Sequence, residues 1–251
     1  MAPNKKTRQV GLARALSKLG YCSRSQAAKL IQEGRVRLNG TTPRNPETPV
    51  RLGRDRMEVD KGTVQPEAKV YLILNKPRGV VTTASDEKGR ETVYACLPPD
   101  LPWVAPVGRL DKASEGLLLL TNDSEWAARI SAPETHLEKT YHVQVQGVFG
   151  ENLLEAIRKG VRTKEGEVLG VGKIEILRRG MQNTWLTIVL EEGKNRQIRR
   201  VMESVGTGVL RLVRISIGPL ALGELAKGFC RTLSGREKQA LDAAMKANNA
   251  K

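Results

Sequence analysis

The sequence is poor in the residues that build disulfide frameworks and metal sites. Its 251 residues include only three cysteines and two histidines. Cys22, Cys96 and Cys230 are widely separated and odd in number, which fits neither a disulfide framework nor a zinc site. His136 and His142 are too few for a histidine-based metal site. We therefore expect reduced thiols, a cytoplasmic location and no bound metal.

Long apolar runs are also missing. No segment approaches the roughly 18 apolar residues of a membrane helix. The first ten residues are basic and polar, unlike a secretory signal. No phosphate-cradling glycine loop is present. The hydrophobic fraction of 39% suits a globular protein, and the length allows one large domain or a small domain plus a medium one.

Acidic residues are outnumbered by basic ones. The chain has 42 lysines and arginines against 27 acidic residues, which gives a formal net charge of +15 and a pI near 10.0. Residues 1–61 alone hold 14 basic and five acidic residues, a net charge of +9. A field of this sign favours a polyanionic partner, usually nucleic acid.

Residues 11–60 have the pattern of a small folded unit. Apolar residues at helical spacing predict a helix over residues 12–19. Ser23 and Gln26 form a capping box that opens a second helix over residues 24–33. A short strand follows that helix.

The strand at Val36 and Leu38 is followed by Asn39-Gly40, a strong hairpin signal. Glu33 is the only acidic residue between Gly11 and Asn39, whereas a merely solvated surface would normally mix both signs. We therefore interpret the basic side chains of this unit as contacts to the phosphate backbone. They are Arg14, Lys18, Arg24, Lys29, Arg35 and Arg37.

This order of elements resembles the small RNA-binding module named after a small-subunit ribosomal protein. Ser23-Arg24 and the Gly-Arg-Val-Arg-Leu-Asn-Gly run at residues 34–40 stand where that family has them. The resemblance implies that the two helices and the following turn bind structured RNA. It carries that role to Arg24, Lys29, Arg35 and Arg37.

Beyond a polar linker at residues 62–68, the pattern becomes mixed. Strands are predicted over residues 70–74, 140–146, 185–190 and 209–217, and helices over residues 124–131, 152–159 and 195–205. A capping box from Ser234 to Glu237 opens a last helix. Many strands with few regular crossovers predict an α+β fold with a mainly antiparallel sheet.

We therefore expect two domains and a C-terminal extension. The expected parts are an RNA-binding domain at residues 1–61 (core 11–60), the linker at 62–68, a catalytic domain at 69–233, and a helix and tail at 234–251.

The most informative motif is Gly-Arg-Leu-Asp-Lys-Ala-Ser-Glu-Gly at residues 108–116, which runs into four leucines. The leucines predict either a strand buried on both faces or a short core helix. A charged residue such as Asp111 is unusual at the edge of an apolar core. An ion pair with Arg109 would explain its position there, and so would a catalytic role.

Two further motifs carry polar residues in patterned positions. Tyr141 lies on the alternating strand that follows Lys139. An arginine cluster precedes an apolar helical stripe, with Asn195 as a plausible N-cap. Phosphate binding explains two of its arginines, Arg196 and Arg200, at least as well as catalysis does.

Together these motifs resemble the RsuA-type pseudouridine synthases, and the match spans essentially the whole chain. It rests on Asn75–Gly79, the Gly-Arg-Leu-Asp block, the Lys-x-Tyr strand, residues 195–200, and residues 212–220. Ser114 stands where the family more often has threonine, and serine keeps the hydroxyl. The resemblance implies an isomerase that cuts the uracil N1–C1′ bond, turns the base and rejoins it through C5.

The resemblance also implies a partner and a role for each site residue. The partner is ribosomal RNA or a ribosome assembly intermediate, the protein is a monomer, and isomerisation needs no cofactor. Asp111 would trap C1′ covalently or remove a ribose proton to give a glycal, and Arg199 would pair with it. Tyr141 would stack on the extruded base. The substrate-binding residues would be Arg109, which steadies the vacated position, and Leu212 and Ile217, which wall the uracil pocket.

Other functions compete with this one. A non-catalytic assembly factor would explain the basic first domain alone. A nucleosidase or glycosidase would need Glu115 beside Asp111 in one site. Binding to double-stranded DNA is not favoured, because the sequence shows no recognition helix with base-reading side chains beyond generic arginines. Within the resembled family, a large-subunit target is preferred slightly over a small-subunit one.

Overall fold

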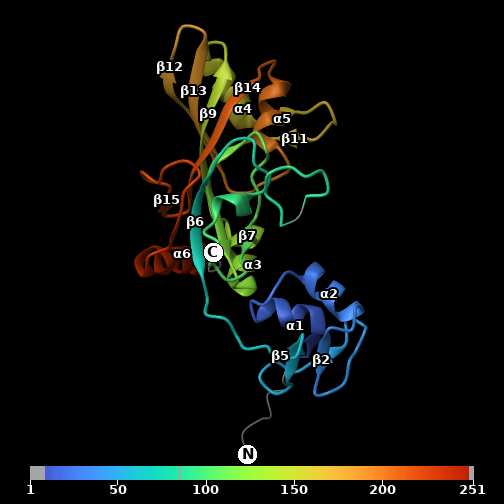
Figure 1. The fold of residues 1–251 in the computed structure, drawn as a ribbon. Helices are drawn as coiled ribbons and strands as arrows, with labels where there is room; N and C mark the ends of the chain where they lie inside the picture. Colours follow the sequence, from blue (N-terminus) through green and yellow to red (C-terminus); the bar gives the residue numbers. More distant parts are fainter. Residues whose placement is uncertain (1–8, 85, 249–251) are drawn as a thin grey trace, which may run out of the picture. The chain divides into compact units, whose positions relative to one another are not determined.

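The computed structural model describes residues 9–84 and 86–248, which form two compact units (Figure 1). One unit runs to Tyr71 and includes Pro98–Ala105 and Leu120–Trp126, and the other holds the remaining described residues. The basic segment before Gln9 and the end of the predicted C-terminal tail lie outside the described residues. Within the described part, no helix has the length and apolar character needed to cross a membrane.

The first unit contains two helices beside short strands. They are β1 (Val10–Gly11), α1 (Leu12–Lys18), α2 (Arg24–Gln32), β2 (Val36–Leu38), β3 (Pro49–Val50), β4 (Met57–Val59) and β5 (Gly62–Thr63). The predicted capping box is present, because Ser23 Oγ accepts from the Gln26 N–H at 3.1 Å and Gln26 Oε1 accepts from the Ser23 N–H at 3.0 Å.

The turn predicted from Asn39-Gly40 is present. Leu38 and Thr41 exchange backbone hydrogen bonds of 2.8 and 3.0 Å, and Asn39 and Gly40 between them have positive φ angles of 49° and 85°. The hairpin ends after this one pair, because β2 then pairs with β4, with Val36 opposite Val59. The Asn39 side chain also accepts from the Arg56 N–H at 2.9 Å, which ties the turn to the loop before β4.

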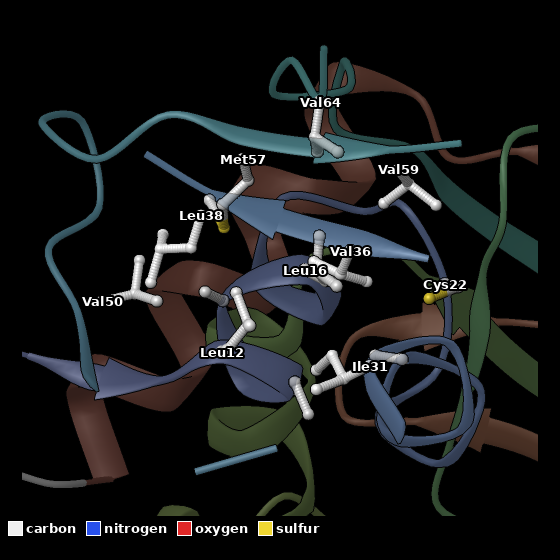
Figure 2. Packing of buried hydrophobic residues seen from close by; sticks show 13 residues of the cluster. Leu12, Leu16, Cys22, Ile31, Val36, Leu38, Val50, Met57, Val59 and Val64 are labelled. Carbon is white, nitrogen blue, oxygen red and sulfur yellow. The ribbon is translucent and has the colours of Figure 1, made fainter. Parts of the chain in front are cut away.

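The sheet of this unit also extends into the predicted linker. β5 pairs with β4 in antiparallel register, and Val64 is buried. Helix residues such as Leu12, Leu16 and Ile31 pack against strand residues (Figure 2). This small cluster is closed by its own apolar side chains, so the exposed arginines around it are free of any packing role.

A nine-stranded sheet organises the second unit. Its order is β12 (Lys173–Arg179), β13 (Asn183–Leu190), β9 (Lys139–Gln146), β14 (Val209–Ile217), β8 (Glu115–Thr121), β6 (Tyr71–Lys76) and β16 (Cys230–Thr232), with β15 (Leu220–Ala221) on β14 and β7 (Ala105–Val107) on β8. The β14–β8 pair is parallel, while β9 pairs antiparallel with both neighbours. The predicted α+β class with a mainly antiparallel sheet is confirmed.

Helices and a small hairpin accompany the sheet. They are η1 (Val93–Cys96), α3 (Ser124–Ser131), η2 (Pro133–Thr135), α4 (Glu151–Lys159), β10 (Val161–Arg162), β11 (Val168–Leu169), α5 (Gln197–Ser204) and α6 (Gly235–Asn248). The Ser234 capping box opens α6 as predicted, with Ser234 Oγ accepting from the Glu237 N–H at 3.2 Å. The cap of α5 differs from the prediction: it is Arg196, in the left-handed region at φ 49°, and not Asn195.

The four leucines form a buried strand and not a helix. Leu117 to Leu120 are each 0% exposed in β8. β8 begins beside Gly116, which has φ +100° and lies against β14 so closely that a Cβ would stand 2.2 Å from the Arg214 carbonyl oxygen. Only glycine allows the two strands to approach in this way.

Alternation along the central strands gives the sheet two different faces. On β9, Tyr141, Val143 and Val145 are buried, whereas His142 and Gln144 remain half-buried. In Figure 1, α4 and α5 are drawn beside the strands β12, β13, β9 and β14. Ile198 of α5 lines the same cavity as Tyr141, so this helix lies on the buried face.

Candidate active site

A cavity of about 290 Å³ opens on the buried face of the sheet. Its walls come from the turn before β8, from β9, from α5 and from β14. The structure brings together there all six residues predicted as catalytic or substrate-binding, and one predicted RNA contact. They are Arg109, Asp111, Tyr141, Arg196, Arg199, Leu212 and Ile217.

Asp111 lies at the cavity wall between two arginines of the α5 region. Its Oδ2 is 3.9 Å from Arg199 Nε and 4.0 Å from Arg196 Nη1, and its side chain is 32% exposed. These separations are at the limit of an ion pair and longer than a hydrogen bond. The carboxylate is therefore held in a positive field but keeps its oxygens available to a ligand.

Arg199 is anchored from behind. Its Nη2 donates to the Ala113 carbonyl at 3.1 Å and its Nη1 donates to the Val209 carbonyl at 3.4 Å. Its buried Nε has no hydrogen-bond partner among the described residues. Burial lowers the pKa of Arg199, and Arg196 lowers it further, while Asp111 raises it. The guanidinium is thus fixed with one unused donor on the side of the carboxylate.

The ion pair expected between Asp111 and Arg109 is not the one the structure contains. Asp111 pairs instead with the two arginines contributed by α5 and its cap. The Ser114 N–H donates to the Asp111 carbonyl at 2.9 Å and closes a tight turn at the start of β8. Arg109 lies in the cavity wall beside this turn.

Tyr141 and β14 supply apolar lining of the same cavity. Tyr141 is 8% exposed and is paired with Arg214 in the antiparallel β9–β14 register. Leu212 and Ile217 of β14 are 6% and 2% exposed. An aromatic ring and two aliphatic side chains in one cavity with a carboxylate can enclose a flat, mostly apolar ring.

Lys76 is a site residue that the sequence analysis did not single out. It is 0% exposed, and its Nζ donates to the carbonyls of Pro77, Asp111 and Ser114 at 3.0, 3.2 and 2.9 Å. Burial lowers its pKa to about 8. The lysine ties the end of β6 to the Asp111 turn. In the sequence it stands within the Asn75–Gly79 motif, as a lysine that ends an apolar strand just before a proline.

Glu115 does not share the cavity with Asp111. It is 4% exposed, accepts from Arg211 Nε at 2.9 Å and Nη2 at 3.1 Å, and pairs with Lys227. Burial works against its charged form, yet the hydrogen bonds from Arg211 and Lys227 outweigh it and keep its pKa below the usual value. A glycosidase with Asp111 and Glu115 as its carboxylate pair is therefore incompatible with the geometry.

The other basic residues predicted to contact RNA differ in their availability. Arg14, Arg24 and Arg37 are exposed and have no acidic partner among the described residues, whereas Lys18 is half-buried. Among the rest, Arg35 pairs with Asp60, Lys29 lies 3.9 Å from Glu33, and Arg200 pairs with Glu165 and Glu167 outside the cavity.

Metal and disulfide chemistry is not indicated by the described part of the chain. The three cysteines are free thiols. Within residues 9–84 and 86–248, no group of histidine, cysteine and acidic side chains could hold a metal ion.

Comparison with known families gives two matches. The family described as RNA pseudouridylate synthase matches residues 70–204, and the S4 domain family matches residues 10–55. The first match contains the Asp111 turn, β9 and all of α5.

Individual proteins are similar over nearly the whole chain. Ribosomal large subunit pseudouridine synthase B of Bacillus subtilis is 36% identical, covering 92% of this chain and 95% of its own. Ribosomal large subunit pseudouridine synthase E of Vibrio parahaemolyticus is 35% identical, covering 84% and 91%. A solved pseudouridylate synthase is similar with a TM-score of 0.66 and 31% identity, covering 92% of this chain and 99% of the solved one.

Proposed function

The chain belongs to the RNA pseudouridylate synthase family and carries an N-terminal S4 domain, and from this we propose that it converts one uridine of large-subunit ribosomal RNA to pseudouridine with Asp111 as the nucleophile. The observation that carries the assignment is the Asp111 carboxylate, held loosely between Arg196 and Arg199 in a cavity that Tyr141 also lines. Two relatives named as large-subunit enzymes favour that subunit over the small one.

The reaction begins by breaking the bond between uracil N1 and ribose C1′. Loss of the base leaves positive character on C1′, which a carboxylate stabilises. In one route Asp111 bonds to C1′ and uracil leaves with the N1 electron pair. In the other route Asp111 removes the C2′ proton, which gives a glycal and free uracil in the site.

The second half of the reaction returns every atom to the product. The detached uracil turns, its C5 bonds to C1′, and the carboxylate leaves C1′ or gives its proton back to C2′. The C5 proton is lost and N1 takes one up. No net oxidation, hydrolysis or group transfer occurs, so the chemistry requires no electron carrier or acceptor.

Arg199 positions the carboxylate in both routes. A guanidinium beside it orients its oxygens. Arg199 is anchored on the Ala113 and Val209 carbonyls, and its Nε lies 3.9 Å from the Asp111 carboxylate. The carboxylate oxygens are therefore available to the substrate.

Tyr141 holds the base and helps to remove the C5 proton, a role supported by its place in the same cavity as Asp111. Its ring stacks on uracil while Leu212 and Ile217 close the pocket. A base inside structured RNA has to leave its stack first, at a cost of a few kcal/mol. Arg109 stands at the wall where it can steady the opened RNA.

The basic residues of the S4 domain hold the RNA for this step. Arg14, Arg24 and Arg37 are exposed and unpaired by acids among the described residues, so they can bind backbone phosphates. Lys29 and Arg35 can exchange their acidic partners for phosphate, and Arg196 and Arg200 extend the basic surface on the catalytic unit.

The test compares ribosomal RNA from wild-type cells, from cells lacking the protein and from cells carrying Asp111→Asn. Carbodiimide treatment followed by reverse transcription maps every pseudouridine. We expect one large-subunit stop to vanish in both altered strains. Loss in the deletion alone would refute the role of Asp111. Loss of a small-subunit stop would show that the target uridine lies in small-subunit ribosomal RNA. Loss of no stop would favour the assembly-factor function.

A further inference from the structure

The face of the sheet opposite the cavity is built differently from the cavity face. Residues that alternate with the buried ones on β9, β13 and β14 remain partly exposed, among them His142, Trp185 and Arg211. A tryptophan at the middle of a half-exposed sheet face is unusual, because a large ring is normally packed away from water.

A continuous row of side chains crosses four strands on this face. Strand register places Arg178 of β12 opposite Trp185 of β13, Trp185 opposite Gln144 of β9, and Gln144 opposite Arg211 of β14. Residues directly opposite each other in neighbouring strands share one face. The row therefore reads arginine, tryptophan, glutamine, arginine across the sheet.

Both arginines of the row approach the indole. The guanidinium carbon of Arg178 lies 5.0 Å from the Trp185 ring centroid, and that of Arg211 lies 5.9 Å away. Both distances are within the range of cation–π contacts. Arg178 is exposed, whereas Arg211 is fixed by its ion pair with Glu115.

The row borders a shallow hollow of mixed character. It is lined by His142, Leu177, Arg178, Trp185, Arg211 and Val213. Leu177 occupies the position where the β12–β13 register shifts, and it is 47% exposed. Lys227 adds a further cation beside Glu115, so this buried acid is opposed by two cations. Arg178 has no ion pair among the residues that the structure describes.

We propose that this Trp185 face is a second RNA-binding surface, which takes an unpaired stretch of RNA by stacking a base on Trp185 and holding its phosphates with Arg178 and Arg211. A half-exposed ring flanked by cations suits single-stranded nucleic acid, which is bound by base stacking and by phosphate contacts. A base that stacks on the indole takes the place of Arg178, and the released guanidinium pairs with the adjoining phosphate.

The charge of the face decides between RNA and other partners. A second copy of this chain, which carries a net charge of +15, would bring like charges onto Arg178 and Lys227. A neutral protein surface would leave the guanidinium groups without partners. Polyanionic RNA satisfies both the ring and the cations. The inference rests on the proposed function only in taking RNA as the substrate.

The test uses the full-length protein and a short fluorescent oligoadenylate, which contains no uridine and therefore cannot serve as a substrate. We expect Trp185→Ala to weaken binding at least about fivefold, the loss of one stacked base. Trp185→Phe keeps a ring and retains most of the affinity. Arg178→Ala lowers the salt dependence of binding by roughly 0.7 in the logarithmic slope.

Arg236→Ala is the matched control, because Arg236 is an exposed arginine on α6. Its affinity is expected to equal the wild-type value. Thermal unfolding of each variant verifies that it is folded. Oligoadenylate affinity unchanged in both Trp185→Ala and Arg178→Ala would overturn the proposal. A change in sedimentation without a change in affinity would overturn it too, in favour of self-association.

A parallel measurement separates this inference from the proposed function. Tritium released from C5-labelled uridine in ribosomal RNA reports isomerisation. At saturating RNA, Trp185→Ala is expected to keep the wild-type single-turnover rate while losing affinity for oligoadenylate. If the wild type released no tritium but Trp185→Ala still lost affinity, the proposed function would fail and the second RNA surface would stand.

Discussion

Asp111 and Glu115 lie four residues apart, and each has two cationic neighbours, yet their surroundings differ in every other respect. Glu115 is 4% exposed and accepts from Arg211 at 2.9 Å. Asp111 is 32% exposed, and its arginines stand at 3.9 and 4.0 Å. One carboxylate is on the cavity face of the sheet, and the other is bonded on the opposite face.

The distance between a carboxylate and its cations indicates whether the carboxylate stabilises the fold or is available to a ligand. Close, hydrogen-bonded ion pairs use the lone pairs of Glu115, so this carboxylate stabilises the strand start and has no capacity left for a ligand. The longer pairs around Asp111 supply charge but leave its oxygens unbonded. The carboxylate proposed to react is thus the one to which its neighbouring cations make no close hydrogen bond.

Catalysis should separate the two carboxylates most strongly. Asp111→Asn is expected to lower the single-turnover rate of tritium release by about 10⁴-fold or more, because the nucleophile is removed. Its free energy of unfolding should change by less than about 1 kcal/mol, since the lost ion pairs are long and partly exposed. If Asp111→Asn kept activity near the wild-type level, Asp111 would not be the reacting carboxylate.

The arginine partners should differ in the same direction. Arg199→Gln is expected to slow tritium release by about 10²- to 10³-fold, the usual cost of one preorganised donor. Arg211→Gln, on the Glu115 side, should leave the rate at saturating RNA unchanged. Rapid-quench kinetics on the two variants measures both. Equal rates would mean that Arg199 acts only on the fold.

Stability should separate the carboxylates in the opposite order. Glu115→Gln is expected to lower the free energy of unfolding by about 2 kcal/mol, less than for a fully buried pair because Arg211 and Lys227 are 42% and 48% exposed. Urea unfolding near neutral pH measures the loss.

The pH dependence of that loss has a defined sign. The pKa of Glu115 is lowered in the folded state, so its contribution is present above the unfolded pKa and disappears as the pH falls through the lowered one. The gap between wild type and Glu115→Gln should therefore close in acid. A gap that is constant with pH would contradict an ionic origin.

The effect expected for Lys76 is confined to the alkaline side. Its pKa is about 8 in the folded protein and 10.5 when unperturbed, so the unfolded chain binds more protons between these values. Stability then rises with pH in that window. In urea unfolding from pH 7 to 10, the free energy of unfolding of the wild type should rise relative to that of Lys76→Met. A parallel profile for both proteins would contradict the lowered pKa.

Much of the fold could be predicted because its signals are local. The period-2 alternation of β9 and the capping boxes of α2 and α6 are read from adjacent residues, and the structure confirms them. The Asn39-Gly40 turn is confirmed as well, but the pairing of β2 with β4 could not be predicted from it, because β4 is distant in sequence. Turn propensity cannot report such a contact.

The site divides in the same way. The Gly-Arg-Leu-Asp block, the strand tyrosine and the arginine cluster could be picked out as motifs, and the structure brings them to one cavity. The Asn75–Gly79 run was also picked out, but the buried role of Lys76 within it could not be, since a lysine at the end of a strand normally reaches water. The partner of Glu115 was equally hidden, because Arg211 is 96 positions away in the chain.

Gly116 has a consequence for the tolerance of this protein to change. β8 carries the Asp111 turn, and β14 carries the register that sets Tyr141, and the two strands meet at Gly116 against the Arg214 backbone. In a deep mutational scan selected for activity, even alanine should not be tolerated at position 116. Positions on the Trp185 face should tolerate conservative substitutions. The spacing between Asp111, the proposed nucleophile, and Tyr141, the proposed stacking residue, therefore depends on a hydrogen atom at position 116 where any other residue would have a Cβ.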